Sequence, residues 1–265
     1  MSVIEAVILG LVQGLTEFLP ISSSGHLELF SAILNVQNSE SLLFSVVVHG
    51  ATAASTIVVF RKDIAALFNN LFVFHWNYET RFIKNIVLSS VPVAIVGLLF
   101  EEQIELLFSG KILMVGFMLL ITGLLLTFTH YAPVSGSKEI SSGKAIIVGI
   151  AQALAIMPGI SRSGATIASS ILLKIDKKEA TKFSFLMVLI PILGASLLKT
   201  IKFLGDSGHQ NQIGTTALLI GFISAFISGL FACNWMVNLV RKGKLYYFAI
   251  YCFAIGIISI IVGAS

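Results

Sequence analysis

Long apolar stretches, separated by short polar segments, make up most of this chain. A helix needs roughly 20 apolar residues to cross the hydrocarbon core of a membrane. Six stretches meet that length and are bounded by polar residues: about 42–60, 85–100, 111–130, 183–203, 214–240 and 245–264. The pattern therefore predicts an all-α polytopic membrane protein with six transmembrane helices.

Two further apolar regions, 3–33 and 144–173, are interrupted near the middle by proline, glycine and serine. The interruptions read Pro20-Ile21-Ser22-Ser23-Ser24-Gly25 and Pro158-Gly159-Ile160-Ser161-Arg162-Ser163-Gly164. Irregular backbone at membrane depth is tolerated only where protein or a water-filled cavity covers it. We therefore expect two re-entrant hairpins, each made of a half-helix, a polar loop and a second half-helix that begins near Ser24 or Ser163.

The two interrupted regions repeat one another after a shift of 139 residues. Gln13 then falls on Gln152, and Ile21-Ser22 falls on Ile160-Ser161. The shared glutamine and the Ile-Ser-x-Ser-Gly core are not explained by apolar composition alone. We expect a single membrane domain, 1–265, built from a first repeat over about 1–130 and a second over about 140–265.

Composition and charge fit a membrane location. The chain is 56% apolar and only 11% charged, whereas soluble domains are about 25% charged. If both hairpins return to the side that they enter from, 13 lysines and arginines lie on one side and 3 on the other, and Arg162 lies inside the second loop. The more basic side contains Arg61, Lys62, Arg81, Lys84, Lys138, Lys144, Lys174, Lys177, Lys178, Lys182, Arg241, Lys242 and Lys244, and the other contains Lys111, Lys199 and Lys202.

Because basic loops stay in the cytoplasm, this asymmetry predicts a multi-pass protein of the cytoplasmic membrane with both termini outside. The excess charge of +4 thus bears on topology and does not indicate a nucleic-acid partner. The hairpins then enter from opposite sides, which makes an inverted-topology repeat. In such folds the site lies near the repeat interface, where helix N-termini point at anionic groups.

The first loop carries an acid, a histidine and several hydroxyls. Gln13 and Glu17 are four residues apart, on one face of the half-helix, and Ser22, Ser23, Ser24, Gly25 and His26 follow. A carboxylate in an apolar segment is costly and marks a functional site by default. The alternative is that Glu17 only reaches the outer interface from a conventional span. His49, within the 42–60 stretch, could line the cavity, but a packing role is favoured.

The second loop supplies the one arginine expected at membrane depth, Arg162. Its planar guanidinium can bind two phosphate oxygens at once. Gly159 and Gly164 allow close approach of the backbone to a ligand. The remaining candidates for substrate binding are Ser161, Ser163 and Thr166. The alternative is an internal ion pair between Arg162 and Glu17, into which an anion could still insert.

Together these groups indicate an oxyanion site suited to phosphoryl transfer. Such a site needs charge stabilisation on the phosphate oxygens and a positioned nucleophile. His26 or Ser23 could attack phosphorus, or His26 could act on water as acid or base. A divalent ion bound by Glu17 and a diphosphate would neutralise further charge.

At these loops the sequence resembles the bacitracin-resistance family of bacterial undecaprenyl-diphosphate phosphatases. The resemblance rests on Gln13-Gly14-Leu15-Thr16-Glu17-Phe18-Leu19-Pro20-Ile21-Ser22-Ser23-Ser24-Gly25-His26 and on Pro158-Gly159-Ile160-Ser161-Arg162-Ser163-Gly164-Ala165-Thr166. It implies hydrolysis of a C55 polyprenyl diphosphate to the monophosphate, which recycles the carrier for peptidoglycan synthesis and confers bacitracin resistance. It also implies Mg²⁺ or Ca²⁺ as cofactor and a site centred on Glu17, Ser23, His26 and Arg162.

One position departs from the family pattern. The family's first loop often carries a second acidic residue where this chain has Gln13. A neutral amide can offer an oxygen to a metal, so Gln13 joins Glu17 as a candidate metal ligand, but it cannot act as a base.

Three functions are compatible with the residues. Besides the phosphatase, inverted repeats and broken helices suit a transporter or flippase for an anionic or polyprenyl phosphate lipid. A non-catalytic membrane scaffold would leave Glu17, His26 and Arg162 without a role. The loop chemistry favours the phosphatase, with a polyprenyl diphosphate lipid as substrate, membrane lipid around it and a possible homodimer.

Overall fold

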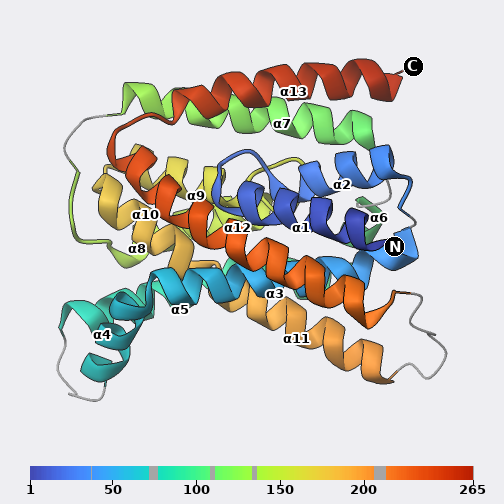
Figure 1. The fold of residues 1–265 in the computed structure, drawn as a ribbon. Coiled ribbons are helices and arrows are strands. Elements are labelled where there is room, and N and C mark those ends of the chain that lie inside the picture. Colours follow the sequence, from blue (N-terminus) through green and yellow to red (C-terminus); the bar gives the residue numbers. More distant parts are fainter. Residues whose placement is uncertain (37, 72–76, 108–110, 133–135, 206–212, 265) are drawn as a thin grey trace.

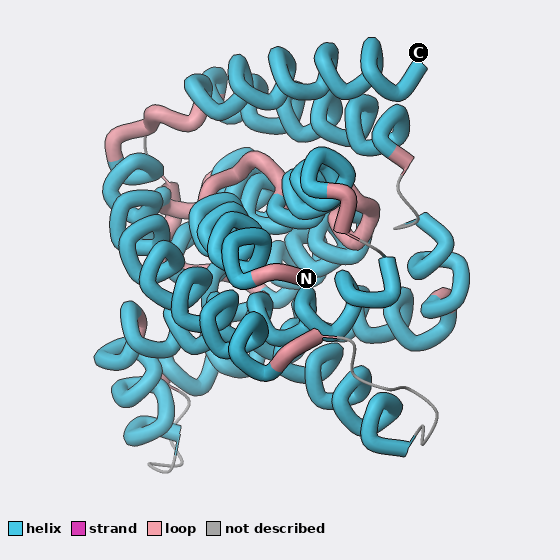
Figure 2. Tube along the Cα trace, turned by 45° about the vertical axis from the view of Figure 1, so that its right-hand side comes forward, coloured by secondary structure: helices cyan, strands magenta, loops and turns pink. Residues whose placement is uncertain are grey.

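The computed structural model describes residues 1–264 except 37, 72–76, 108–110, 133–135 and 206–212. Among these residues the chain is helical, and the β-type pairing is limited to an isolated bridge between Ser137 and Ile175 (Figure 2). In chain order the helices are α1 (Val3–Phe18), α2 (Ser23–Leu34), α3 (Asn38–Val59), α4 (Arg61–Leu71), α5 (Tyr78–Leu99), α6 (Glu101–Leu107), α7 (Ile112–Phe128), the 3₁₀ turn η1 (Thr129–Tyr131), α8 (Ser142–Leu154), α9 (Arg162–Leu172), α10 (Lys177–Met187), α11 (Leu189–Gly205), α12 (Thr215–Arg241) and α13 (Tyr246–Ala264).

Within the described part, five segments are long and apolar enough to cross a membrane, which confirms the all-α, multi-span prediction. A sixth is formed if Leu43–Val59 and Arg61–Asn70, which meet at 73°, are counted as one bent span. The five are Tyr78–Leu99, Ile112–Tyr131, Lys177–Ile201, Thr215–Arg241 and Tyr246–Ala264.

The segment predicted at 183–203 differs from the prediction in its start and in its continuity. It begins at Lys177 and consists of two helices, because α10 ends at Met187 and α11 starts at Leu189. Pro191 explains the interruption, since its nitrogen cannot donate to the Met187 carbonyl and its ring crowds that carbonyl. The start is earlier because Asp176 caps the helix by accepting hydrogen bonds from the amides of Lys178 and Glu179.

Both interrupted regions form two helices joined by a short loop. At 1.5 Å per residue, α1 is about 24 Å long and α8 about 20 Å, so neither spans a hydrocarbon core of about 30 Å alone. The second helices begin at Ser23 and Arg162, one residue before the predicted Ser24 and Ser163.

Equivalent serines cap these second helices, which explains their start points. The Ser22 hydroxyl accepts from the Gly25 amide at 3.2 Å, and the Ser161 hydroxyl accepts from the Gly164 amide at 3.0 Å. A capping hydroxyl satisfies one of the free amides of a first helical turn. The repeated Ser-x-x-Gly spacing therefore produces the same capping hydrogen bond twice.

The first helix of each hairpin packs against a helix of the other repeat. Helix α1 packs on α12 and α8 packs on α5, while α7 and α13 pair with each other. The close approaches use equivalent glycines: a Cβ on Gly10 would lie 2.6 Å from the Gly221 carbonyl oxygen, and one on Gly149 would lie 2.4 Å from that of Ser89. Each first half-helix thus packs against a long helix of the other repeat.

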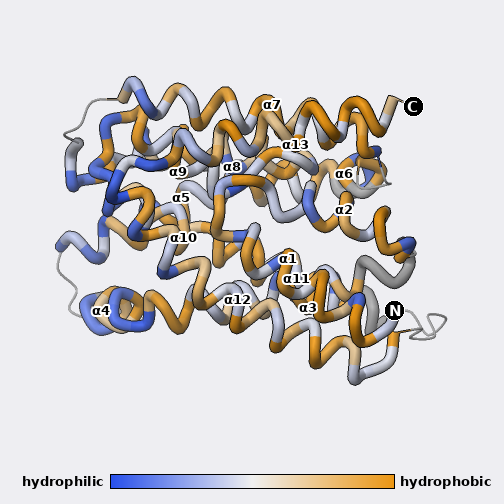
Figure 3. The backbone as a smooth tube through the Cα atoms, turned by 45° about the horizontal axis from the view of Figure 1, so that its top comes forward, coloured by the Kyte–Doolittle hydropathy of each residue, from blue (hydrophilic) through white to orange (hydrophobic). Residues whose placement is uncertain are grey.

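The two ends of the molecule differ in hydropathy. Figure 1 shows both termini at one end and α4 at the other, with α7 and α13 side by side along one edge. Figure 3 shows hydrophilic segments gathering at the end that contains α4. The two hairpin loops lie between these ends, inside the helical bundle.

Candidate active site

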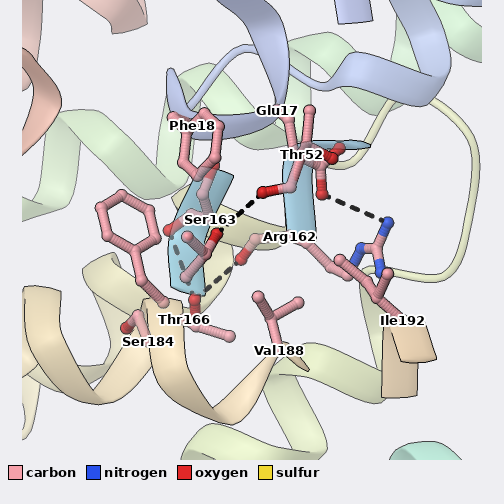
Figure 4. Close-up of a pocket in the computed structure, with 11 residues that line it drawn as sticks. Glu17, Phe18, Thr52, Arg162, Ser163, Thr166, Ser184, Val188 and Ile192 are labelled. Carbon is pink, nitrogen blue, oxygen red and sulfur yellow. Dashed lines mark hydrogen bonds and ion pairs between the residues drawn. The ribbon is translucent and has the colours of Figure 1, made fainter. Parts of the chain in front are cut away.

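A cavity lies where helices from both repeats converge on Glu17 and Arg162 (Figure 4). Its walls come from α1, α3, α9, α10 and α11. Charged and hydroxyl side chains form one part of the lining, namely Glu17, Arg162, Thr52, Thr56, Ser163, Thr166 and Ser184. Apolar side chains form the remainder, namely Phe18, Phe185, Val188 and Ile192. The cavity thus offers polar and charged groups beside an apolar surface.

The Glu17 carboxylate is the centre of the polar part, and its side chain is only 8% exposed. Its Oε2 accepts hydrogen bonds from the Gln13 amide at 2.9 Å and from the Ser23 hydroxyl at 2.5 Å. Its Oε1 lies 3.6 Å from an Arg162 guanidinium nitrogen. The structure therefore brings together Gln13, Glu17, Ser23 and Arg162 as the sequence predicted, and includes the ion pair considered there as an alternative.

Of the two roles considered for His49, packing is favoured from the sequence, whereas the structure places the side chain beside Glu17. Its Nε2 lies 3.7 Å from Glu17 Oε2, and its Nδ1 lies 2.8 Å from the Ser45 carbonyl oxygen. Packing of α3 against α1 brings the histidine to the carboxylate. His49 is thus a polar neighbour of the site.

Arg162 is the first residue of α9, beside the free amides of that helix start. A helix N-terminus favours anions through these amides and the helix dipole. At 3.6 Å the guanidinium is near Glu17 but beyond hydrogen-bonding distance, so its donors remain able to bind phosphate oxygens. The Thr166 hydroxyl, four residues on, donates to the Arg162 carbonyl at 2.9 Å and steadies this turn.

Helix α7 anchors the second loop. The Thr122 hydroxyl donates to the Gly159 carbonyl at 3.2 Å and accepts from the Ser161 amide at 3.1 Å. Gly159 has a φ of +96°, a conformation that favours glycine, and a Cβ there would lie 2.6 Å from the Val115 carbonyl oxygen. The loop conformation therefore depends on this glycine and on a threonine from another helix.

The two loops contact each other directly. The Ser163 hydroxyl donates to the Leu19 carbonyl at 3.3 Å. A Cβ on Gly25 would lie 3.1 Å from the Gly159 Cα, so the two backbones meet at glycines. The two hairpin loops thus build one site from opposite halves of the chain.

His26 contacts both the first loop and helix α13. Its Nδ1 lies 2.8 Å from the Ser22 carbonyl oxygen, and its Nε2 lies 2.8 Å from the hydroxyl of Tyr251 on α13, whose ring stacks beside it. A carbonyl can only accept, so Nδ1 carries the hydrogen, and in the neutral ring Nε2 accepts from Tyr251. The structure thus places His26 in the first turn of α2, directly after the first loop, and in contact with α13.

Ser22 itself adopts an uncommon backbone conformation. Its φ is +71°, in the left-handed region that non-glycine residues rarely occupy, whereas its counterpart Ser161 has a φ of −75°. Such conformations cost about 1–3 kcal/mol and cluster at functional sites. The two repeats therefore differ in backbone as well as in side chains at this point.

Comparison with known proteins shows which family the chain belongs to. The model of the family described as bacitracin resistance protein BacA matches residues 6–258, which include both loops. The chain belongs to the BacA family.

Relatives at full length carry one functional name. A protein of Christiangramia forsetii is 54% identical over 265 residues, and one of Bacteroides fragilis is 49% identical over 258 residues, covering 98% and 97% of both chains respectively. A more distant relative from Methanobrevibacter smithii is 37% identical and covers 97% of this chain and 96% of its own. All three are named undecaprenyl-diphosphatase.

The donor set of this BacA-family site is compatible with a divalent cation that also binds substrate. Gln13 is fully buried, and among the described residues its Oε1 has no hydrogen-bond partner. In the part of the chain that the structure describes, no group of three or more His, Cys, Asp or Glu side chains is placed to hold a metal ion on its own. Mg²⁺ commonly uses one or two carboxylates plus substrate phosphates and water. One carboxylate, Glu17, and one amide oxygen, Gln13, fit that mode of binding.

Several side chains of this BacA-family site were missed in the sequence. Thr52 and Thr56 lie on the same face of α3 as His49, at helical spacing. The ionisable His49 inside an apolar span was the available signal for that face. Thr122 and Tyr251 reach the loops from α7 and α13. Their positions depend on tertiary packing, and no local pattern marks them.

Proposed function

We propose that this chain hydrolyses undecaprenyl diphosphate to undecaprenyl phosphate and inorganic phosphate, thereby recycling the lipid carrier for peptidoglycan synthesis and conferring bacitracin resistance. The observation that carries the proposal is the Glu17–Arg162 pair in a buried cavity at the junction of the two loops. Full-length relatives named undecaprenyl-diphosphatase support it.

Arg162 and the start of α9 bind the phosphate to be released. The guanidinium donates to its oxygens, and the first amides of α9 add positive potential at the same place. Ser161, Ser163, Gly164 and Thr166 form the surrounding wall. Charge that develops on the phosphate oxygens in the transition state is stabilised by these groups.

Glu17 orients the group that reacts with phosphorus. Its contact with Ser23 at 2.5 Å means that the carboxylate can accept the hydroxyl proton if Ser23 attacks, or can act on a water bound in the same place. When water attacks, a new oxygen–phosphorus bond forms, the bond from phosphorus to the bridging oxygen of the diphosphate breaks, and undecaprenyl phosphate leaves. When Ser23 attacks, the same bond breaks and a phosphoserine forms, which water hydrolyses in a second step to release inorganic phosphate. A Mg²⁺ or Ca²⁺ ion held by Glu17 and Gln13 would neutralise phosphate charge.

His26 serves the first loop as acid, base or alternative nucleophile. Its Nε2 must exchange Tyr251 for the substrate or a water before it acts, because the Tyr251 hydroxyl lies 2.8 Å away. Ser22, Ser24 and Gly25 complete the substrate-binding wall of this loop.

The proposed arrangement in the membrane is six transmembrane helices and two re-entrant hairpins in an inverted repeat. Two observations support it: α1 and α8 are too short to span the membrane alone, and each packs against a helix of the other repeat. The concentration of basic residues on one side supports external termini and an outward-facing site.

Reconstitution of the purified protein into liposomes with undecaprenyl diphosphate and Mg²⁺ tests this function. The phosphatase releases inorganic phosphate and leaves the monophosphate lipid. Movement of intact diphosphate lipid between leaflets without phosphate release would instead support the transporter or flippase that inverted repeats also suit.

A further inference from the structure

We propose that Thr122 of α7 is a positioning residue for Arg162 and acts through the backbone of the second loop. Thr122 is buried, and its hydroxyl oxygen accepts a hydrogen bond from the Ser161 amide at 3.1 Å. The hydroxyl hydrogen is shared between two carbonyl oxygens, each at 3.2 Å: that of Gly159 in the loop and that of Met118, one turn earlier on α7. One side chain thus connects a helix of the first repeat to the loop of the second.

The Ser161 amide is a sensitive point of this loop. Ser161 is buried and caps α9 through the Gly164 amide at 3.0 Å. A backbone amide can only donate, so in a buried position it needs an acceptor, which Thr122 supplies. Arg162 follows as the first residue of α9. The orientation of Ser161 therefore decides the direction in which the Arg162 side chain leaves the backbone.

The Arg162 side chain depends on this backbone because its ion pair with Glu17 is long. The nearest guanidinium nitrogen lies 3.6 Å from Glu17 Oε1, beyond hydrogen-bonding distance, and the side chain is 25% exposed. In the proposed reaction the guanidinium stabilises charge that develops on phosphate oxygens, and a displacement of about 1 Å can cost roughly 100-fold in rate. A shift of the loop should therefore lower kcat.

The first loop is held in a comparable way from the other repeat. Helix α13, which packs on α7, contacts it through Tyr251, whose hydroxyl donates to His26 Nε2 at 2.8 Å. The next residue, Cys252, lies with its Sγ 3.7 Å from the Pro20 carbonyl oxygen. Each loop is thus contacted by a helix of the opposite repeat, and Thr122 is the contact that bears on Arg162.

The test compares Thr122→Val and Thr122→Ser with the wild type. Valine keeps the shape of threonine but leaves the Ser161 amide without its acceptor, whereas serine keeps the hydroxyl. Valine should lower kcat for release of inorganic phosphate from undecaprenyl diphosphate on the order of 10-fold, because an unpaired buried amide costs about one factor of ten. KM should stay within about 3-fold, since the apolar chain contributes much of the binding of this lipid. Serine should restore most of the rate.

Thr127→Val is the matched control. This threonine lies on the same helix, and its hydroxyl donates to the Gly123 carbonyl one turn earlier at 2.8 Å. The control should leave kcat and KM unchanged. Rates are compared at equal concentrations of folded protein, checked by melting curves in detergent. Thr122→Ala removes the same hydroxyl without placing a methyl group against the loop, should also be slow, and decides the test if the valine variant does not fold.

This inference rests on the proposed phosphatase function, and the two fail differently. If the wild type releases no phosphate, the proposed function fails. If the wild type is active and the folded valine or alanine variant turns over normally, the role of Thr122 is refuted alone. A serine variant as slow as valine, or an equal loss in Thr127→Val, would likewise refute it, because the effect would then not come from the Thr122 hydroxyl. A rise in KM with unchanged kcat would also contradict positioning.

Discussion

The ion pair between Glu17 and Arg162 can be tested by replacing either residue alone or both together. We expect a different change in the free energy of unfolding for each of the three variants. The two charges lie 3.6 Å apart, with side chains 8% and 25% exposed. At an effective dielectric constant of about 20, the attraction is about 5 kcal/mol, most of which offsets the cost of burying the charges. The pair should therefore matter far more to function than to net stability.

Arg162→Gln leaves a buried carboxylate without its cationic partner and should be the more destabilising single change. Breaking a fully buried pair costs roughly 3–5 kcal/mol. The donors Gln13 and Ser23 still stabilise the carboxylate, so we expect about 3 kcal/mol or less. Glu17→Gln should cost less, because Arg162 is more exposed and can move toward water.

The double variant Glu17→Gln/Arg162→Gln removes both charges and should recover most of the lost stability. All three variants should lose phosphate release, since each lacks a charged group that contacts substrate or cation. The assay is a melting curve in detergent for each variant, paired with phosphate release from undecaprenyl diphosphate. A double variant whose destabilisation equals the sum of the two singles would show that the charges do not interact. Substantial turnover by Arg162→Gln would refute its assigned role.

Three further outcomes follow from the geometry. Gly14→Ala should lower the melting temperature in detergent markedly, because its Cβ would lie 2.0 Å from the Ser228 hydroxyl and 2.4 Å from the Ala225 carbonyl oxygen, whereas Gly143→Ala, with nothing within 4 Å, should not. Treatment with a chelator should abolish phosphate release, and added Mg²⁺ should restore it; full activity in excess chelator would remove the cation from the proposal. Cysteines introduced at both termini should react with an impermeant reagent added outside intact cells, and protection of both would reverse the proposed orientation.

Much of the fold was predictable because membrane helices are specified by length and apolarity. The prediction of several spans and of two broken segments needed only the pattern of apolar residues and the positions of Pro20 and Pro158. The interruption at Met187–Leu189 was missed because the apolar pattern continues through it. Pro191 indicates the interruption, because proline removes a helical hydrogen bond, but a prediction from apolar composition alone does not take that into account.

The candidate site was predictable where its residues are local in sequence. Gln13 and Ser23 each contact Glu17 within a single hairpin. Helix spacing was enough to group Gln13 with Glu17, and Ser23 follows only six residues later. Tyr251 contacts His26 from 225 residues away, and no sequence pattern relates the two. Long-range packing decides such pairs.

The decisive measurement is the initial rate of inorganic phosphate release from undecaprenyl diphosphate by the purified protein, compared with that of Glu17→Gln at matched folded concentration. The proposed site predicts steady release by the wild type and release at or near background by the variant. Equal rates for the two proteins would contradict the assignment of the reaction to the cavity between the two loops.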